Sequence, residues 1–159
     1  LGLYYMSLEF NGQKGEGSVF ADLAEVELAL EAGEVTMHTK IKARYNTVDS
    51  TGQPVIQIVD TTPGRYMLAQ LLPRDKNVPF SVINRVLTKK EVSNLIDVIY
   101  RYCGQKETVI FADRVMKMGF TNACKAGISF GKDDMLIPPE KYAILEQADA
   151  RVKEFEQQY

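Results

Sequence analysis

Residues 105–135 read QKETVIFADRVMKMGFTNACKAGISFGKDDM, and this stretch decides how the rest of the chain is organised. Its first part has an apolar helical pattern, which predicts a helix from about Glu107 to Lys125. Because apolar side chains occur on more than one side of this helix, we expect neighbours to bury it on several faces. Two glycines then break the pattern before Asp133 and Asp134. The stretch therefore predicts a packed helix that leads into an acidic loop.

One stripe of this helix carries both signs of charge. Lys106, Ile110, Asp113 and Lys117 follow one another at spacings of four, three and four residues, so they share one face. A ladder of surface ion pairs, each worth about a few tenths of a kcal/mol, is the simpler interpretation. A stripe that contacts an anion or a nucleotide is the alternative, and spacing alone leaves both open.

The acidic pair that follows is a weak signal for chemistry. Adjacent carboxylates such as those of Asp133 and Asp134 can bind a hard cation or act in acid/base catalysis. The sequence offers them no third ligand at a suitable spacing. Helix capping or channel electrostatics is therefore the favoured interpretation.

A last helix is predicted over about residues 138–159, opened by Pro138 and Pro139. Its apolar residues recur at intervals of three and four, which is typical of a coiled-coil seam. The seam consists of Tyr142, Leu145, Ala148, Val152, Phe155 and Tyr159. Such a seam requires a partner helix, so we expect the first arm of a helical hairpin. Since the chain starts at Leu1 and stops inside this pattern, we also expect it to be a piece of a larger polypeptide.

Upstream, capping signals predict two more helices. Thr62 is a candidate N-cap with Pro63 as the first helical residue, and Thr88 with Glu91 forms a capping box for a helix that Gly104 ends. Cations in the first turn of a helix oppose its dipole. Arg65, Lys89 and Lys90 are placed in this way. For Arg65 this hints at a specific carboxylate or phosphate partner.

The first 60 residues are expected to be rich in β-structure. Leu3–Met6 suggests a short buried strand, residues 11–18 a surface loop, and residues 22–32 a capped helix. From Val35 to Tyr45 the pattern alternates as in a strand, and residues 49–52 predict the turn of a hairpin to the strand at 55–59. One face of the first of these strands would carry four basic or potentially basic groups: His38, Lys40, Lys42 and Arg44. A solvated face is the simpler interpretation, and a surface for phosphates or an acidic partner is the alternative.

The predicted fold class is therefore α+β. It comprises a β-rich part to about residue 60, a helical part over about 61–135, and a projecting C-terminal helix over about 138–159 within a single fragment.

Composition excludes several classes of function. With 159 residues, one histidine, two cysteines and a formal net charge of −2, the chain does not match a disulfide framework, a zinc site or a basic nucleic-acid binder. No apolar run approaches the roughly 20 residues that cross a bilayer. Two thiols suit a reducing compartment, so a cytoplasmic location is expected.

Several fragments occur in an order that resembles the β′ subunit of bacterial DNA-directed RNA polymerase. They are LGLYYMS, KGEG, TTPGR, PFSVINRVLTKKEVSNLID, YRYCGQKETVIFADR, GISFGKDDMLIPPEK and the terminal EQQY. Each is weak alone, but the ordered set is highly specific. The resemblance implies an internal piece of that subunit, from the pore or secondary-channel region through the first rim helix.

The same resemblance implies a role in transcription without catalysis by this piece alone. The family's catalytic NADFDGD motif does not occur in the sequence. The Mg²⁺ of the intact nucleotidyltransferase would be bound by residues outside this chain, which itself would need no cofactor. The piece would help to wall the channel by which nucleoside triphosphates enter and backtracked RNA 3′ ends leave.

Site residues and partners also follow from the resemblance. Lys89, Lys90, Asp133 and Asp134 would line the channel, and the helix with Tyr142, Leu145, Val152 and Phe155 would meet Gre-type and DksA-like channel factors. The stripe of Lys106, Ile110, Asp113 and Lys117 would adjoin the ω subunit and contact guanosine tetraphosphate in some members. Lys117 stands where those members have an aromatic residue. The remaining partners implied are β and the rest of β′, in a nucleoid-associated enzyme.

Two other classes of function remain open from the sequence. One is a free-standing α+β interaction module that dimerises through its C-terminal helix, and the other is a small metal-dependent hydrolase built on Asp133 and Asp134.

Overall fold

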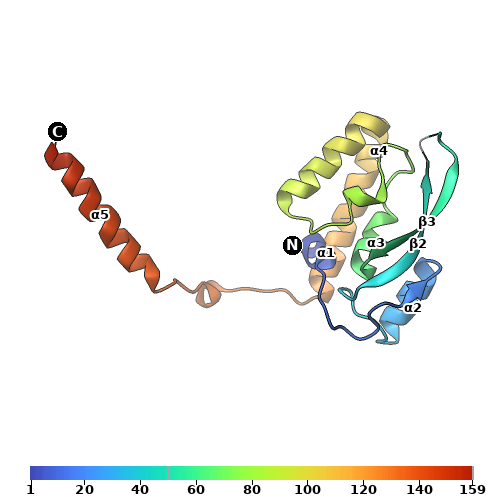
Figure 1. Ribbon diagram of the computed structural model, residues 1–159, viewed down its shortest axis with the longest axis horizontal. Helices are drawn as coiled ribbons and strands as arrows, with labels where there is room; N and C mark the ends of the chain where they lie inside the picture. Colours follow the sequence, from blue (N-terminus) through green and yellow to red (C-terminus); the bar gives the residue numbers. More distant parts are fainter. Residues whose placement is uncertain (50, 159) are drawn as a thin grey trace. The chain divides into compact units, whose positions relative to one another are not determined.

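The chain divides into two units, Leu1–Gly127 and Ile128–Tyr159. The computed structural model describes residues 1–49 and 51–158, the side chains of residues 157 and 158 excepted. The first unit combines a small sheet with helices, and the second holds the short turn η2 (Lys132–Asp134) and helix α5 (Glu140–Gln158) (Figure 1). The α+β class predicted from the sequence is confirmed.

The sheet has three strands in the order β1 (Val19–Phe20), β2 (Ile41–Val48) and β3 (Pro54–Thr61). β1 pairs with β2 in parallel, whereas β2 and β3 form the predicted antiparallel hairpin with Ile41 opposite Thr61. At the turn, the carboxylate of Asp49 accepts hydrogen bonds from the backbone N–H of Thr51 (2.8 Å) and of Gln53 (2.9 Å). Ser50 of the predicted turn lies outside the described residues.

The alternation of β2 places one face of the sheet on the core. Ile41, Ala43 and Tyr45 are buried, whereas Lys42 and Arg44 are exposed, as the period-two pattern predicted. Tyr45 donates a hydrogen bond to the carbonyl of Ala69 (3.3 Å), which fixes the sheet against helix α3 (Pro63–Ala69).

The predicted strand from Val35 was wrong in its first half, because β2 begins only at Ile41. His38 is not on a basic face: it is 7% exposed, and its Nδ1 lies 3.2 Å from the carbonyl oxygen of Leu8. The rings of Tyr5 and Phe10 pack edge-on against it. The carbonyl can only accept, so Nδ1 carries the proton. Desolvation by burial lowers the pKa of His38.

The N-terminal segment is a helix, α1 (Gly2–Ser7), and the predicted strand at Leu3–Met6 was wrong. A strand would need an edge to pair with, whereas α1 packs against two helices through glycines. A Cβ on Gly2 would collide with the carbonyl of Gly119, and a Cβ on Gly64 would collide with the carbonyl of Met6. The close approach of helical backbones therefore decides the local structure here.

Two short helices follow their predicted caps. In α2 (Leu23–Glu31), the Asp22 carboxylate accepts from the backbone N–H of Glu25 (3.0 Å). In α3, the Thr62 hydroxyl accepts from the backbone N–H of Arg65 (3.3 Å), and Pro63 occupies the first turn. Both predictions are confirmed, and the predicted loop at residues 11–18 contains no helix and no strand.

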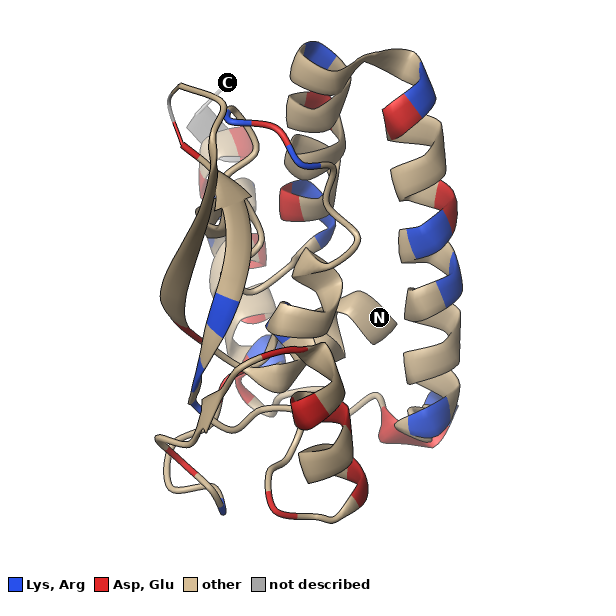
Figure 2. Ribbon diagram, turned by 90° about the vertical axis from the view of Figure 1, so that its right-hand side faces the viewer, with Lys and Arg blue, Asp and Glu red and all other residues tan. Residues whose placement is uncertain are grey.

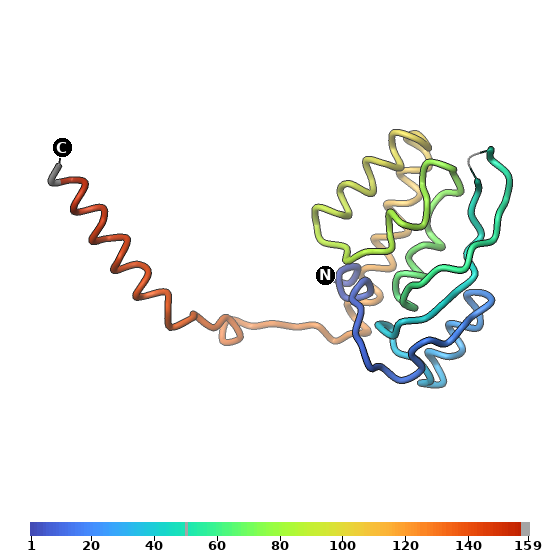
Figure 3. Tube along the Cα trace, viewed as in Figure 1, coloured from blue at the N-terminus to red at the C-terminus, as the bar shows by residue number. Residues whose placement is uncertain are grey.

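After the short turn η1 (Phe80–Val82), helix α4 (Lys89–Lys125) consists of two arms. Gly104 interrupts the helix with φ 80° and ψ 177°, so the chain bends sharply there (Figures 1 and 3). We call residues 89–103 the first arm and residues 105–125 the second arm. The predicted helix end at Gly104 and the predicted new helix beyond it are confirmed.

The core lies between the sheet, α1, α3 and both arms of α4. Its fully buried large side chains include Met6, Ile41, Leu68, Ile83, Ile99 and Phe111. Among the described helices, none is long and apolar enough to cross a membrane.

Candidate functional site

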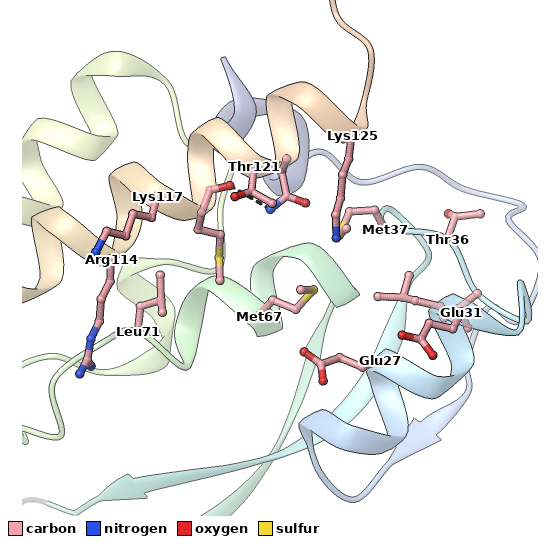
Figure 4. Close-up of a pocket in the computed structure, with 14 residues that line it drawn as sticks. Glu27, Glu31, Thr36, Met37, Met67, Leu71, Arg114, Lys117, Thr121 and Lys125 are labelled. Atoms are coloured by element: carbon pink, nitrogen blue, oxygen red, sulfur yellow. Dashed lines mark hydrogen bonds between the residues drawn. The ribbon is translucent and has the colours of Figure 1, made fainter.

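The first unit has a cavity of about 850 Å³ between α2, α3 and the second arm of α4 (Figure 4). Its floor is apolar and largely half-buried. The floor residues are Leu30, Val35, Met37, Met67, Leu71 and Met118. The helical periodicity of α2 and of the second arm brings these side chains to one side of each helix.

Charged side chains of opposite sign stand on opposite sides of this floor. Glu27 and Glu31 project from α2, whereas Arg114, Lys117 and Lys125 project from the second arm (Figure 4). Figure 2 shows where acidic and basic residues lie on these helices. Among the described residues, no ion pair joins the two sides. The cavity can therefore hold a ligand that presents an apolar surface together with both signs of charge.

The predicted stripe lies on the second arm, beside this cavity. Lys106, Asp113 and Lys117 are exposed and Ile110 is half-buried. Lys117 Nζ lies 3.0 Å from Asp113 Oδ2, which is the ion pair that the simpler interpretation predicted. Lys117 also lines the cavity, whereas Lys106, Ile110 and Asp113 do not. The structure thus brings one of the four stripe residues into the cavity.

Lys89 and Lys90 occupy the first turn of α4 and are both exposed. The cap beneath them differs in part from the prediction. The Thr88 hydroxyl accepts from the backbone N–H of Glu91 (3.3 Å), but the Glu91 carboxylate lies 3.2 Å from Arg85 Nη1. The carboxylate thus places negative charge in the first turn, where it offsets the unfavourable position of the two lysines.

Asp133 and Asp134 lie in η2 of the second unit and are exposed. Asp134 Oδ2 accepts from the backbone N–H of Gly131 (2.7 Å), so the predicted capping interpretation is confirmed for this residue. Within the part of the chain that the structure describes, no three His, Cys, Asp or Glu side chains are grouped as metal ligands would be.

The predicted seam of α5 is open to solvent. Tyr142, Leu145, Val152 and Phe155 are each exposed by half or more. The helix itself is confirmed. Leaving such side chains in water forgoes about 1.5–3 kcal/mol each, so this face is suited to a partner helix.

The second arm is less buried than its pattern predicted. Val109 is 62% exposed, Met116 51% and Phe120 71%. We expected neighbours to bury this helix on several faces; within this chain that expectation was wrong, because Phe111 and Val115 are buried on one side while the three side chains above face solvent. Sequence periodicity reports that a face is apolar, but not which molecule covers it.

A charge cluster that joins the buried Arg65 to the solvent-accessible Glu9 and Lys40 was only partly visible in the sequence. Arg65 is 8% exposed, donates from Nε to the carbonyl of Ser7 (2.8 Å), and pairs through Nη1 with Glu9 (2.9 Å). The other oxygen of Glu9 lies 3.2 Å from Lys40 Nζ. The unfavourable position of Arg65 at a helix N-terminus was the signal that pointed to a carboxylate. The sequence did not indicate which one.

The fold and these surfaces define the class of protein: an α+β segment whose charged and apolar faces are suited to assembly with other chains. Comparison with known families then makes the assignment. The family described as RNA polymerase Rpb1, domain 3, matches residues 1–135, so this chain belongs to that family. It is accordingly part of the largest subunit of a multisubunit DNA-directed RNA polymerase, a nucleotidyltransferase.

Proposed function

We propose that this chain is an internal piece of a bacterial-type β′ subunit that forms part of the wall of the secondary channel. Nucleoside triphosphates would enter, and backtracked RNA 3′ ends would leave, along this wall. The observation that carries the proposal is the ordered set of β′-like fragments along the chain, together with the family match over residues 1–135. Catalysis and Mg²⁺ binding are assigned to residues outside this chain.

Charged residues near the channel would adjust the path of Mg²⁺-bound triphosphates. We assign this role to Lys89, Lys90, Asp133 and Asp134, whose exposure leaves them free to set the local potential. In an intact polymerase that carries this sequence, Lys89→Glu with Lys90→Glu should raise the KM for nucleoside triphosphates about three- to tenfold while kcat changes little.

Steady-state elongation on a defined template measures both constants. Lys76→Glu is the matched control, because Lys76 is an exposed lysine outside the proposed lining. An unchanged KM in the double variant, or an equal increase in the control, would remove these lysines from the channel.

Helix α5 is proposed to be the rim helix that Gre-type and DksA-like factors contact, with the seam of Tyr142, Leu145, Val152 and Phe155 facing its partner arm in the intact subunit. β, ω and the rest of β′ are the proposed neighbours of the remaining apolar surface. That surface includes Val109, Met116 and Phe120, which are exposed in this chain.

The stripe of Lys106, Ile110, Asp113 and Lys117 is proposed to contact guanosine tetraphosphate beside ω. Lys106 is exposed, and among the described residues no carboxylate lies within salt-bridge distance of its ammonium group. Lys106→Ala in the whole polymerase should weaken binding of the tetraphosphate about tenfold, since a charge-assisted contact to phosphate is lost. Isothermal titration gives the affinity, with Arg101→Ala as the control on the first arm; unchanged affinity in Lys106→Ala refutes the assignment.

The exposed seam of α5 also supports the second candidate, an interaction module that dimerises through this helix. Light scattering of the chain with and without Leu145→Glu separates the two functions. A tight dimer that Leu145→Glu abolishes, in a chain that does not assemble with the other polymerase subunits, would favour the module.

A further inference from the structure

We propose that the 850 Å³ cavity between α2, α3 and the second arm of α4 is a docking groove for an amphipathic α-helix of a protein partner. The partner helix would lay its apolar face on the floor. It would present basic side chains towards α2 and acidic side chains towards α4. This inference does not depend on the role in the secondary channel.

The floor is suited to an apolar helix face. Met37, Met67 and Met118 are half-buried and border the hollow from three different segments. Methionine is flexible and polarisable, so a methionine-lined floor adapts to side chains of varied shape. Laying the apolar face of a helix into such a groove is a recurrent mode of peptide recognition.

The charges select the kind of partner. Glu27 and Glu31 lie one turn apart on α2, an arrangement that destabilises an isolated helix by like-charge repulsion. Basic side chains of a docked helix would relieve that repulsion. On the other side Arg114 and Lys125 have no carboxylate within salt-bridge distance among the described residues. Acidic side chains of the same helix would meet them.

A small phosphorylated ligand suits this geometry less well. The carboxylates of Glu27 and Glu31 would repel it from one side, and the floor between the two charged sides consists of methionine, leucine and valine side chains. An amphipathic helix, with a width of about 10–12 Å, satisfies both charged sides and the apolar floor together.

The test uses the full 159-residue chain and labelled synthetic helices of about 18 residues, long enough to be helical in water. All share one leucine- and methionine-rich face. One peptide has a lysine flank and a glutamate flank, a second has two lysine flanks, and a third has two glutamate flanks. Fluorescence anisotropy measures their dissociation constants. We expect the mixed peptide to bind at least about tenfold more tightly than the other two, since each of them sets like charges against one side of the groove.

Protein variants locate the binding. Glu27→Lys with Glu31→Lys makes both sides basic, so preference should move to the peptide with two glutamate flanks. Met67→Glu should weaken the mixed peptide by at least about tenfold because it puts a charge on the floor. Met116→Glu, on the exposed face of the second arm, is the matched control and should change nothing. Circular dichroism verifies that each variant is folded.

Three outcomes would overturn the proposal: no preference for the mixed peptide, no change of preference in the double lysine variant, or equal weakening by Met116→Glu. Competition by inorganic pyrophosphate at comparable concentration would identify the cavity as an anion site instead.

Discussion

Arg65 shows how a residue that is unfavourable locally can be stabilised by the fold. Its position in the first turn of α3 opposes the helix dipole, and burial adds a desolvation cost. The carbonyl of Ser7 and the carboxylate of Glu9 compensate both, and Glu9 also reaches Lys40. The cluster ties the segment after α1 to α3 and to the start of the sheet.

Removing the charge of Glu9 tests this cluster. Glu9→Gln should lower the free energy of unfolding by about 1–3 kcal/mol, because the Arg65 guanidinium stays buried without its counter-charge. Urea denaturation at neutral pH gives the value. Asp60→Asn removes a carboxylate 3.9 Å from the exposed Lys42 and should cost less than about 0.5 kcal/mol. Equal losses in the two variants would show that the Glu9 pair behaves as a surface pair.

His38 predicts a pH dependence of stability. Since burial lowers the pKa of His38 in the folded chain, the unfolded chain binds the proton first as pH falls. The stability contributed by the neutral ring is present above the unfolded pKa of about 6.5 and is lost below it, by up to about 1.4 kcal/mol per pH unit. Urea denaturation between pH 7.5 and 5.5 measures the slope. His38→Gln should flatten it, because the chain has one histidine; an identical slope would contradict the prediction.

At the residue scale, the sequence predicts what is local. The caps Asp22, Thr62 and Thr88 each accept from a backbone N–H three residues further on, and each was predictable from spacing. The partners of Arg65 lie more than fifty positions away along the chain. No periodic pattern encodes such a distance, so the need for a carboxylate could be predicted but Glu9 could not.

At the scale of elements, close contact between helix backbones organises the first unit. Gly64 of α3 leaves no room for a Cβ beside the carbonyl of Met6, whereas a Cβ on Gly119 of α4 would meet Leu3 Cγ at an ordinary 3.4 Å. The two glycines therefore respond differently to the same substitution, although both lie in helices beside α1.

Gly64→Ala should destabilise the chain by about 2–4 kcal/mol, because the added methyl group must separate α1 from α3. Gly119→Ala should range from neutral to about 1 kcal/mol stabilising, since alanine is the better helix former. Thermal unfolding followed by circular dichroism compares them. The packing described here would be wrong if Gly119→Ala were the more damaging of the two.

The elements differ in how far local sequence determines them. The break in α4 was predictable, because Gly104 adopts a positive φ that suits glycine. Helix α1 was not: it has six residues and no side-chain cap, and the apolar run at Leu3–Met6 is equally compatible with a strand. Contacts with α3 and α4 decide that it is helical, and those contacts are remote in sequence.

At the scale of the whole molecule, the two units should be independent in stability. Among the described residues, every buried apolar side chain of the core precedes Gly127. Removal of residues 128–159 should therefore change the urea midpoint of the first unit by an amount equivalent to less than about 1 kcal/mol. A larger loss would mean that the second unit contributes to the core. Proton NMR spectra of both forms would show whether the resonances of residues 1–127 coincide.

The cavity also belongs to this scale, and the sequence could not predict it. Its walls come from α2, α3 and α4, so its existence depends on how three helices pack rather than on the pattern of any one. The stripe on α4 was predictable as a helical face. That Lys117 alone of its four members lines the cavity could not be predicted, because this depends on where α2 packs. The polymerase family could be recognised from the ordered motifs and the family match, but not from the shape of the cavity.

The placement of α1 has a consequence for synthesis on the ribosome. The surfaces on which α1 docks are translated after the helix itself: they include the backbone around Gly119 and the N–H of Leu87, which donates a hydrogen bond to the Ser7 hydroxyl (2.8 Å). Nascent α1 must therefore wait through more than a hundred elongation steps before it can dock against Gly119. During that interval Met6 and its neighbours are open to chaperones, and translation speed rather than equilibrium stability governs how long the exposure lasts.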